Sequence, residues 1–455
     1  MLPSARMRAL RSAAASFFLF LAVGLAVAWP SLRWPMVYDD LHLLRSFTPA
    51  EKAGAWSGSW DPDGIEHAGL RPLTLLFNDL RYRLFVEDVA AHRVFVIVLL
   101  ALYARLLVAL GAAAGLPPPA GVAAGLLLLC SRYTAYHLVW LTDGNHAVQG
   151  LLFSASALAL LRGLREGRRP WVWLAGSLSA FAAAALVRED VLALGPVLLL
   201  LGAAAASRPH RRALVGFAAG VIVLTLALFA YRARAVPEAP APGLDLAGFG
   251  IAAGRTLILV GPESFDGISG ALVWTWTAAP VLVLAALLGL PRPPAWRAPV
   301  VFLAAAVVAA TPALTFRRDD MLFFPVSFAA LFYGGALEAL ARRGTVLRAA
   351  AAALLLSGVL GGAYVSRTFA LNFHPDSARA IRWNAQMIYG RFADRATIPA
   401  ERRAAMVRQL AGQGVASEAD LRPLGVRIVG ARVEGPFRPA TPGTLFFPPL
   451  LERDF

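Results

Sequence analysis

The feature that most constrains this chain is a series of apolar stretches, each close to the length of a membrane span. A helix needs about 20 predominantly apolar residues to cross the hydrocarbon core of a bilayer. The chain has 455 residues, 58% of them hydrophobic, and its mean hydropathy is +0.61. These values are too apolar for an ordinary soluble domain. The sequence therefore predicts an all-α, multi-pass membrane protein.

Length and polarity place about 11 spans along the chain. They run over Ala13–Pro30, Val94–Ala114, Ala120–Tyr136, His146–Leu161, Trp171–Val187, Val191–Ala206, Ala213–Tyr231, Ala271–Leu290, Ala298–Phe316, Met321–Leu340 and Ala349–Val365. Only the first part of the third span, Ala120–Cys130, is free of polar residues. This pattern divides the chain into a membrane domain, 1–365, and a C-terminal region, 366–455.

Arginine placement predicts the orientation, because basic residues in short loops stay on the cytoplasmic side. With a retained first helix and a cytoplasmic N-terminus, the inner segments hold 15 of the 43 lysines and arginines. They hold only two acidic residues, Glu166 and Glu338. The net charge of +15 is therefore mainly a topology signal, and it gives no support to nucleic-acid binding. We expect an integral protein of a bacterial inner membrane.

Three segments outside the membrane are long enough to contribute to a site: 31–93, 231–270 and the C-terminal region. The C-terminal region is predicted as a small extracytoplasmic α+β domain that leans on the membrane domain. Its expected elements are a helix over Ser377–Phe392 capped by Asp376, a helix over Pro399–Gly412 and a strand over Val426–Val433. The single cysteine, Cys130, excludes an intrachain disulfide.

The first outer segment contains a predicted amphipathic helix that begins at Arg71-Pro72, with proline in its first turn. Its apolar residues recur at the spacing of one helix face, at Leu73, Leu76, Phe77, Leu80 and Leu84. We expect this helix to lie along the membrane surface. Asn78, Arg81 and Arg83 would then face away from the lipid.

Asp39 and Asp40 lie where the first span meets the first outer segment. One interpretation is that they cap a short helix over Leu41–Ser46. The other makes one of them a general base, which accepts a proton from a reacting hydroxyl at the membrane surface. Adjacent carboxylates repel each other when ionised, which raises one pKa toward neutrality. Acidic residues at such a position are costly to desolvate and usually mark a site.

Asp143 and His146 form a second polar cluster, in the outer turn between the third and fourth spans. A His–Asp pair can contribute to a metal site, but such a site needs more ligands than this spacing provides. We therefore predict no metal or other cofactor, with a divalent metal as the less favoured alternative. Hydrogen bonding to a hydroxylated substrate is the favoured role for these two residues.

Three arginines at outer helix ends break the positive-inside pattern locally: Arg188 in Arg188-Glu189-Asp190, and Arg317 and Arg318. Charges at hairpin turns often serve only to keep the turn in water. An anionic phosphate at the interface would also explain them, because guanidinium groups bind phosphate oxygens in two-point geometry. We predict that these three arginines bind a phosphate, with Arg71 and Glu189 near the same substrate.

The order of motifs resembles a known family. Val37-Tyr38-Asp39-Asp40, Arg71–Phe77, Leu84-Phe85 and Ala91–Val94 are similar to the N-terminal part of the tetratricopeptide-containing transmembrane O-mannosyltransferases. That family is a branch of the GT-C glycosyltransferase superfamily. Leu186–Asp190 resembles its lysine-glutamate hairpin, with arginine in place of lysine, and Arg318–Pro325 resembles its arginine-tyrosine stretch. No tetratricopeptide repeats follow the last predicted span.

The resemblance implies a GT-C fold and an enzyme that takes a sugar from a polyprenyl phosphate on the outer face of the membrane. It implies that an acidic residue of the first loop is the base, and that a hydroxyl acceptor attacks with inversion. The implied partners are a polyprenyl-phosphate sugar, a hydroxyl acceptor in protein or envelope material, and the bilayer, with no nucleic acid.

Two other functions stay open from the sequence. A transporter or lipid flippase is one, although such proteins usually place polar sites near mid-membrane and often contain paired repeats. A non-catalytic scaffold of the cell envelope is the other. The ionisable clusters of this chain fall at predicted outer helix ends, which favours chemistry at the membrane surface.

The charge pattern makes a testable prediction of topology. In a Cys130→Ala background, single cysteines at positions 208, 297 and 343 should react only from the cytoplasmic side. Cysteines at positions 60, 143 and 400 should react only from outside, because the basic inner loops fix the orientation. Labelling with a membrane-impermeant thiol reagent measures this, and reaction of position 343 from outside would contradict it.

Overall fold

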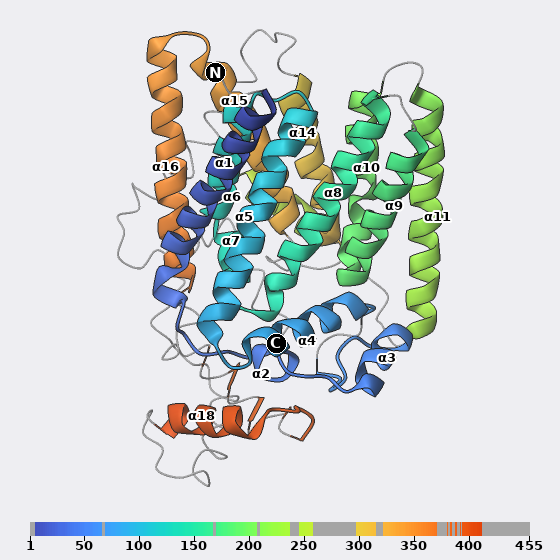
Figure 1. Ribbon diagram of the computed structural model, residues 1–455, viewed down its shortest axis with the longest axis vertical. Helices are drawn as coiled ribbons and strands as arrows, with labels where there is room; N and C mark the ends of the chain where they lie inside the picture. Colours follow the sequence, from blue (N-terminus) through green and yellow to red (C-terminus); the bar gives the residue numbers. More distant parts are fainter. Residues whose placement is uncertain are drawn as a thin grey trace.

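The computed structural model of the protein describes residues 5–65, 69–166, 170–206, 210–236, 245–257, 297–314, 322–370 and, with short gaps, 380–411. Long helices run side by side and form a bundle, and short helices lie across one of its ends (Figure 1). The first residues of the N-terminal helix lie at the opposite end (Figure 1).

The long helices are α1 (Ala5–Ala28), α5 (Val89–Ala113), α8 (Asn145–Glu166), α9 (Pro170–Val187), α11 (Arg211–Ala235), α15 (Phe323–Ala341) and α16 (Thr345–Ala370). The shorter ones in the bundle are α6 (Pro118–Leu129), α7 (Arg132–Val139), α10 (Gly195–Ala205), α12 (Leu246–Leu257) and α14 (Arg297–Ala309). Short 3-10 turns cover Trp29–Ser31, Thr142–Gly144, Glu189–Leu194 and Thr311–Leu314.

The predicted spans agree closely with these helices. Every predicted span coincides with one or more helices except Ala271–Leu290, which lies outside the described residues. Seven described helices are long and apolar enough to cross a membrane, or up to eight if the bent pair α6 and α7 is one span. Helices α10 and α14, with 11 and 13 residues, are shorter than a full span. The chain is therefore an all-α, multi-pass membrane protein.

The predicted third span is broken between α6 and α7, whose axes differ by 57°. The break follows from the polar residues after Cys130. Ser131 accepts a hydrogen bond from the backbone N–H of Thr134 and so caps α7, and the Thr134 hydroxyl donates to the carbonyl of Leu128 at 2.7 Å. These side chains satisfy backbone groups that the break would otherwise expose. The bend directs α7 toward the turn that contains Asp143.

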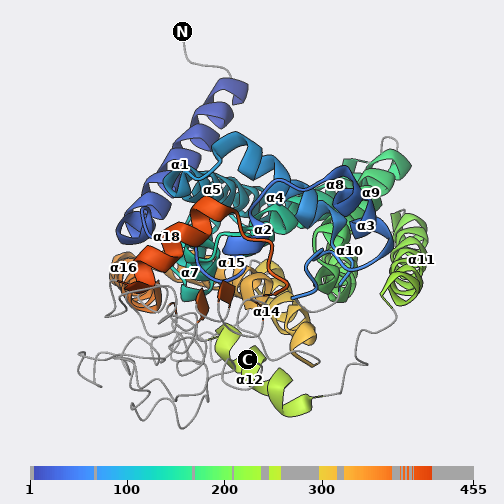
Figure 2. The same ribbon diagram turned by 90° about the horizontal axis from the view of Figure 1, so that it is seen from below.

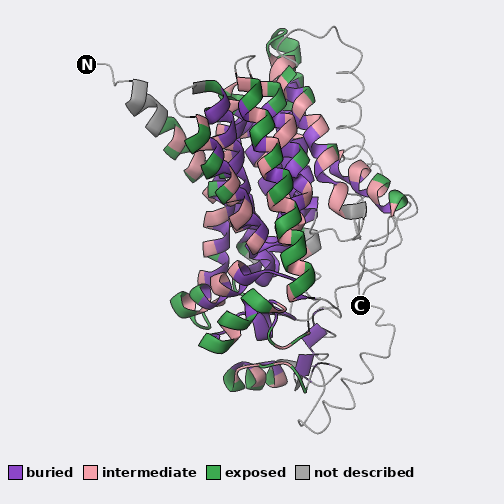
Figure 3. Ribbon diagram, turned by 90° about the vertical axis from the view of Figure 1, so that its right-hand side faces the viewer, coloured by how far each residue is buried: buried purple, intermediate pink, exposed green. Residues whose placement is uncertain are grey.

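Helix α15 lies in the interior of the bundle, and its residues from Phe323 to Leu337 are buried. Buried residues fill the middle of the bundle, whereas α11 and α16 carry exposed apolar residues on its outer faces (Figure 3). Exposed side chains such as Ile222, Leu226 and Leu360 are apolar, as a surface that faces lipid requires.

Four short helices lie at the end of the bundle opposite the start of α1: α2 (Asp40–Leu43), α3 (Pro49–Ser57), α4 (Pro72–Phe85) and α18 (Ala400–Ala411) (Figure 2). Helix α4 is the amphipathic helix predicted from the sequence. Its Leu80 and Leu84 are exposed, and Asn78 and Arg81 are buried against the protein. This arrangement agrees with a helix on the membrane surface whose apolar face contacts lipid.

The C-terminal region differs in part from the prediction. Helix α18 confirms the helix expected at Pro399–Gly412. Within the range expected for the preceding helix, the described helical residues include Trp383, Asn384, Met387 and Ile388. The α+β fold is not supported, because the described residues from 380 to 411 are helical or irregular. Asp376 and the predicted strand Val426–Val433 lie outside the described residues.

Close packing of α15 against α6 generates a prediction. A Cβ atom at Gly334 would collide with the backbone carbonyl of Ala120 and lie 3.1 Å from the backbone nitrogen of Ala124. Gly334→Ala should therefore lower the free energy of unfolding by about 1–3 kcal/mol through overpacking. Equilibrium unfolding of the detergent-solubilised protein measures the loss. Gly176→Ala is the control, because nothing lies within 4 Å of a Cβ there. Equal stability of the two variants would contradict the packing.

Candidate functional site

Asp39 and Asp40 lie at the start of α2, at the end of the bundle opposite the start of α1. Asp39 occupies the position before the helix, but among the described residues its side chain makes no capping hydrogen bond. The helix also ends at Leu43, so the predicted capped helix over Leu41–Ser46 was wrong. The two carboxylates instead point to different partners.

The Asp40 carboxylate joins the first outer loop to the turn that contains Asp143. Its Oδ1 accepts a hydrogen bond from the backbone N–H of Thr142 at 2.7 Å, and its Oδ2 accepts one from Leu141 at 3.2 Å. Burial raises the pKa of Asp40 above its usual value, and these hydrogen bonds with the nearby guanidinium groups of Arg81 and Arg93 oppose the rise. A raised pKa was expected from repulsion between the two aspartates, whereas desolvation is its main cause here.

The Asp39 carboxylate lies beside His42. His42 Nε2 is 3.8 Å from Asp39 Oδ1, and His42 Nδ1 is 3.2 Å from Asp63 Oδ2 and 3.8 Å from Asp61 Oδ1. Burial alone would lower the pKa of this imidazole, but contacts with Asp39, Asp63 and Asp61 raise it to about 10. With this raised pKa, the imidazole is a buried cation at neutral pH, in contact with three carboxylates.

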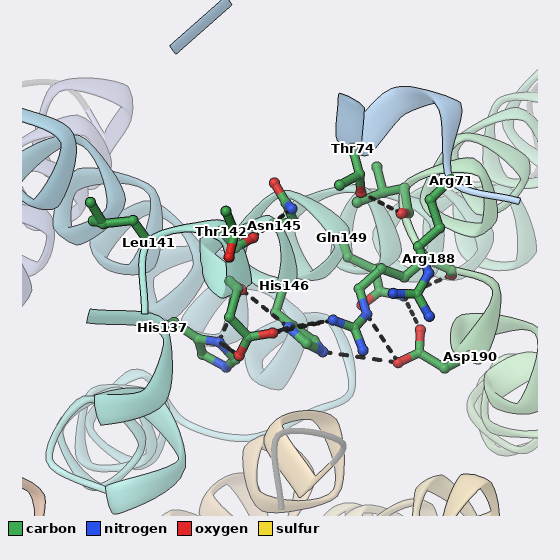
Figure 4. Close-up of polar contacts among 12 residues, drawn as sticks. Arg71, Thr74, His137, Leu141, Thr142, Asn145, His146, Gln149, Arg188 and Asp190 are labelled. Atoms are coloured by element: carbon green, nitrogen blue, oxygen red, sulfur yellow. Dashed lines mark hydrogen bonds and ion pairs between the residues drawn. The ribbon is translucent and has the colours of Figure 1, made fainter. Parts of the chain in front are cut away.

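The second predicted cluster forms as expected and gains a residue that the sequence did not indicate. His137 Nδ1 is 2.9 Å from Asp143 Oδ2, and His146 Nδ1 is 3.1 Å from Asp143 Oδ1. Figure 4 shows the His137 and His146 rings close together, with the Arg188 guanidinium next to His146. Arg188 Nη1 is 3.2 Å from Asp143 Oδ1. Asp143, His146 and Arg188, predicted from two separate motifs, therefore lie in direct contact.

Arg188 has a second carboxylate neighbour, Asp190, whose Oδ2 lies 3.5 Å from Arg188 Nε. Gln149 on α8 fixes this turn, because its side-chain amide donates to the Arg188 carbonyl at 2.9 Å and to Asp190 Oδ1 at 2.6 Å (Figure 4). The guanidinium charge is matched within the protein. A bound phosphate would therefore have to replace at least one of these carboxylates.

Arg71 and Glu189, which we predicted to lie near the same substrate, form an ion pair. Arg71 Nε is 2.8 Å from Glu189 Oε2, and the guanidinium also lies over the Trp60 ring at 5.5 Å from its centroid. The hydroxyl of Thr74, one turn into α4, donates to the Val187 carbonyl at 2.6 Å. These contacts attach the start of α4 to the end of α9, beside Arg188.

The structure thus brings the predicted site residues that it describes to one end of the bundle: Asp39, Asp40, Arg71, Asp143, His146, Arg188 and Glu189. Arg317 and Arg318 lie outside the described residues. The sequence did not indicate His42 or His137 as site residues, and it included Asp190 only as part of the Arg188-Glu189-Asp190 turn. His137 could have been suspected, because it lies only nine residues before His146 in the sequence. Spacing alone does not show that both rings face one carboxylate.

Among the described residues, two groups have the residue types of a cation site: His137, Asp143 and His146, and His42, Asp61 and Asp63. The ligand atoms of each group lie within 4.8 Å of one another. The first group therefore has the third ligand that the sequence lacked. However, each group already includes or contacts a positive charge: the first contacts the Arg188 guanidinium, and in the second His42 itself is an imidazolium. A divalent metal would have to displace that charge.

Comparison with known proteins gives few matches. The chain matches no protein-family model, and no curated protein sequence matches it. Among solved structures, it is similar to ArnT from Cupriavidus metallidurans, whose crystal structure contains undecaprenyl phosphate. The TM-score is 0.45 and the identity 17%, over 91% of this chain and 77% of that one. These values are too low to establish a shared activity.

The charged state of His42 predicts a pH dependence of stability. The folded pKa of about 10 lies above the ordinary value of 6.5, so the contribution of this imidazole is fully present below pH 6.5. It is lost as the pH rises through about 10. The free energy of unfolding of the wild type should therefore fall between these two pH values more steeply than that of His42→Gln. His210→Gln, at the start of α11, is the control and should follow the wild type. Parallel curves for wild type and His42→Gln would contradict the charged state.

Proposed function

We propose that this chain is a membrane glycosyltransferase of the GT-C type, which transfers a sugar from a polyprenyl phosphate to a hydroxyl acceptor on the outer face. One observation supports this most directly. The hydrogen bonds from Leu141 and Thr142 to Asp40 place the acidic first loop next to the cluster of Asp143 and Arg188. Two clusters found separately in the sequence thus form one site at the helix ends, where ionisable residues usually serve a function.

Asp39 is the better candidate for the base, because both oxygens of Asp40 already accept backbone hydrogen bonds. In the proposed step, the acceptor oxygen attacks the anomeric carbon and forms the new C–O bond, while the bond from that carbon to the phosphate oxygen breaks. The hydroxyl proton moves to Asp39, and the polyprenyl phosphate leaves with the electron pair. Attack opposite the leaving group inverts the anomeric configuration.

Arg188 is proposed to stabilise the charge on the departing phosphate, together with Arg317 and Arg318. A preorganised cation contributes most where charge develops in the transition state. The two carboxylates that contact Arg188 hold its guanidinium in place before the donor binds. Arg71, Glu189, His146 and Asp143 are proposed to bind hydroxyl groups of the sugar or the acceptor. The reaction needs no cofactor in this proposal.

The position of the site favours transfer over transport. Transporters usually bind their substrate near the middle of the membrane, between repeats or broken helices. The clusters described above lie at the ends of α7, α8 and α9 and in the short helices across them (Figure 2). The similarity of the first-loop motif to O-mannosyltransferases also supports a glycosyltransferase.

The base makes a sharp prediction. Asp39→Asn keeps the shape of the side chain and removes its ability to accept a proton. It should lower transfer from polyprenyl-phosphate sugars by about 10²–10⁴-fold, with unchanged binding of a polyprenyl phosphate. Transfer by the purified protein in lipid nanodiscs measures the first quantity, and titration with undecaprenyl phosphate the second.

Asp394→Asn is the matched control, because Asp394 is an exposed carboxylate of the same outer region. It should keep wild-type transfer. Near-normal transfer by Asp39→Asn would remove Asp39 as the base. An inactive wild type that binds the lipid and moves it across the bilayer would instead support a flippase.

A further inference from the structure

The residue before Asp39 has an unusual backbone conformation. Tyr38 has a φ of +52°, a left-handed conformation that is unfavourable for a bulky side chain. Such a residue persists only where its surroundings fix it, and such positions cluster at active sites. The direction in which the chain presents Asp39 therefore depends on whatever holds Tyr38.

Residues of the C-terminal region hold Tyr38. Its backbone N–H donates to the side-chain oxygen of Asn384 at 3.1 Å. Its ring packs against Trp383 at 5.2 Å and Phe392 at 6.5 Å between centroids, with Trp140 on the membrane domain at 6.1 Å. Asn384 is fully buried and Trp383 nearly so. Residues about 350 positions apart in the sequence thus share one small core.

Arg402 on α18 binds the other side of the same loop. Its Nη1 donates to the carbonyls of Asp40 and Leu41, both at 2.9 Å, and its Nη2 donates to the carbonyl of Leu44 at 3.0 Å. The carbonyls at the end of a helix have no partner within that helix, and a guanidinium satisfies them well. Arg402 also forms an ion pair with Glu87 at 2.6 Å and is only 6% exposed.

A third contact connects the C-terminal region to the charges around Asp39. Thr397 donates to Asp63 from its backbone N–H at 3.0 Å and from its hydroxyl at 2.8 Å. Asp63 in turn contacts His42, which lies beside Asp39. The C-terminal region therefore contacts the loop before Asp39 and after it, and it also contacts Asp63, the partner of the imidazole that faces Asp39. Figure 2 shows α18 lying across this end of the bundle near α2.

We propose that a set of C-terminal residues forms a positioning element for Asp39: Trp383, Asn384, Phe392, Thr397 and Arg402. Within it, Asn384 and Arg402 are the positioning residues. This inference rests on the proposed function. Asn384 and Arg402 act through the loop, by selecting the one conformation in which Asp39 can accept the acceptor proton. A loop conformation that carries backbone strain needs such support, because without it the chain relaxes toward ordinary φ values.

The test compares Arg402→Gln and Arg402→Lys with the matched control Arg408→Gln, an exposed arginine on the same helix. The first readout is amide hydrogen exchange of residues 37–44 in the full-length protein in nanodiscs. Loss of the charge-assisted hydrogen bonds should speed exchange there by about 10- to 100-fold in Arg402→Gln. Arg402→Lys should exchange more slowly than Arg402→Gln but faster than the wild type. Lysine keeps the positive charge but cannot donate several hydrogen bonds in the fixed planar geometry of a guanidinium group. Arg408→Gln should exchange like the wild type.

The second readout separates positioning from general stability. Arg402→Gln should lower kcat while KM for the donor, lipid binding and Tm stay near those of Arg408→Gln. Glu87→Gln removes the ion pair and leaves the bonds to the loop carbonyls, so it should keep most of the activity. If Arg402→Gln does not fold, Asn384→Ala serves instead, with faster exchange expected at the Tyr38 amide.

The outcomes are distinct for the two proposals. Unchanged exchange of residues 37–44 in both Arg402→Gln and Asn384→Ala would overturn the positioning role, whatever the activity. Faster exchange with unchanged kcat would overturn it as well. In that case Arg402 would order the loop, but this order would have no effect on transfer. If the wild type transfers sugar from none of the donors, the proposed function is overturned. Wild-type transfer is measured before any variant, so this result is separate from the test of positioning.

Discussion

The site depends on one buried carboxylate. Asp40 accepts hydrogen bonds from Leu141 and Thr142, and by doing so it fixes the first outer loop against the turn between α7 and α8. A buried carboxylate is costly to desolvate, and that cost is offset only when hydrogen bonds and nearby positive charges compensate it. Arg81 and Arg93 supply those charges. This contact holds the loop that carries Asp39 against the turn that contains Asp143.

Much of the architecture follows from local patterns in the sequence. Long apolar stretches predict the spans, and the residues after Cys130 explain why one span breaks into α6 and α7. The repeat of apolar residues after Pro72 predicts α4 with the correct exposed face. Such features are predictable because a helix forms from residues near in sequence, and its outward face is fixed by its period of 3.6 residues.

The contacts within the site are not predictable in this way. Asp40 and Thr142 are 102 residues apart, and Arg71 and Glu189 are 118 apart. The sequence singled out several members of these clusters, since ionisable residues at helix ends are few and costly. The sequence did not show which of these residues pair, and it missed His42 and His137, because spacing along the chain does not show which carboxylate a histidine faces. The support of Tyr38 by Asn384 was likewise beyond a single-sequence argument.

Glycosyl transfer is distinguished most directly from its alternatives by the configuration of the anomeric carbon in the product. Purified protein in nanodiscs would receive polyprenyl-phosphate sugars of defined anomeric configuration and simple hydroxyl acceptors, with no nucleotide sugar present. NMR of the product should show the inverted configuration, with one polyprenyl phosphate released for each sugar transferred. A retained configuration would contradict the single-displacement mechanism. Movement of intact lipid-linked sugar across the bilayer, without cleavage, would contradict the enzyme altogether.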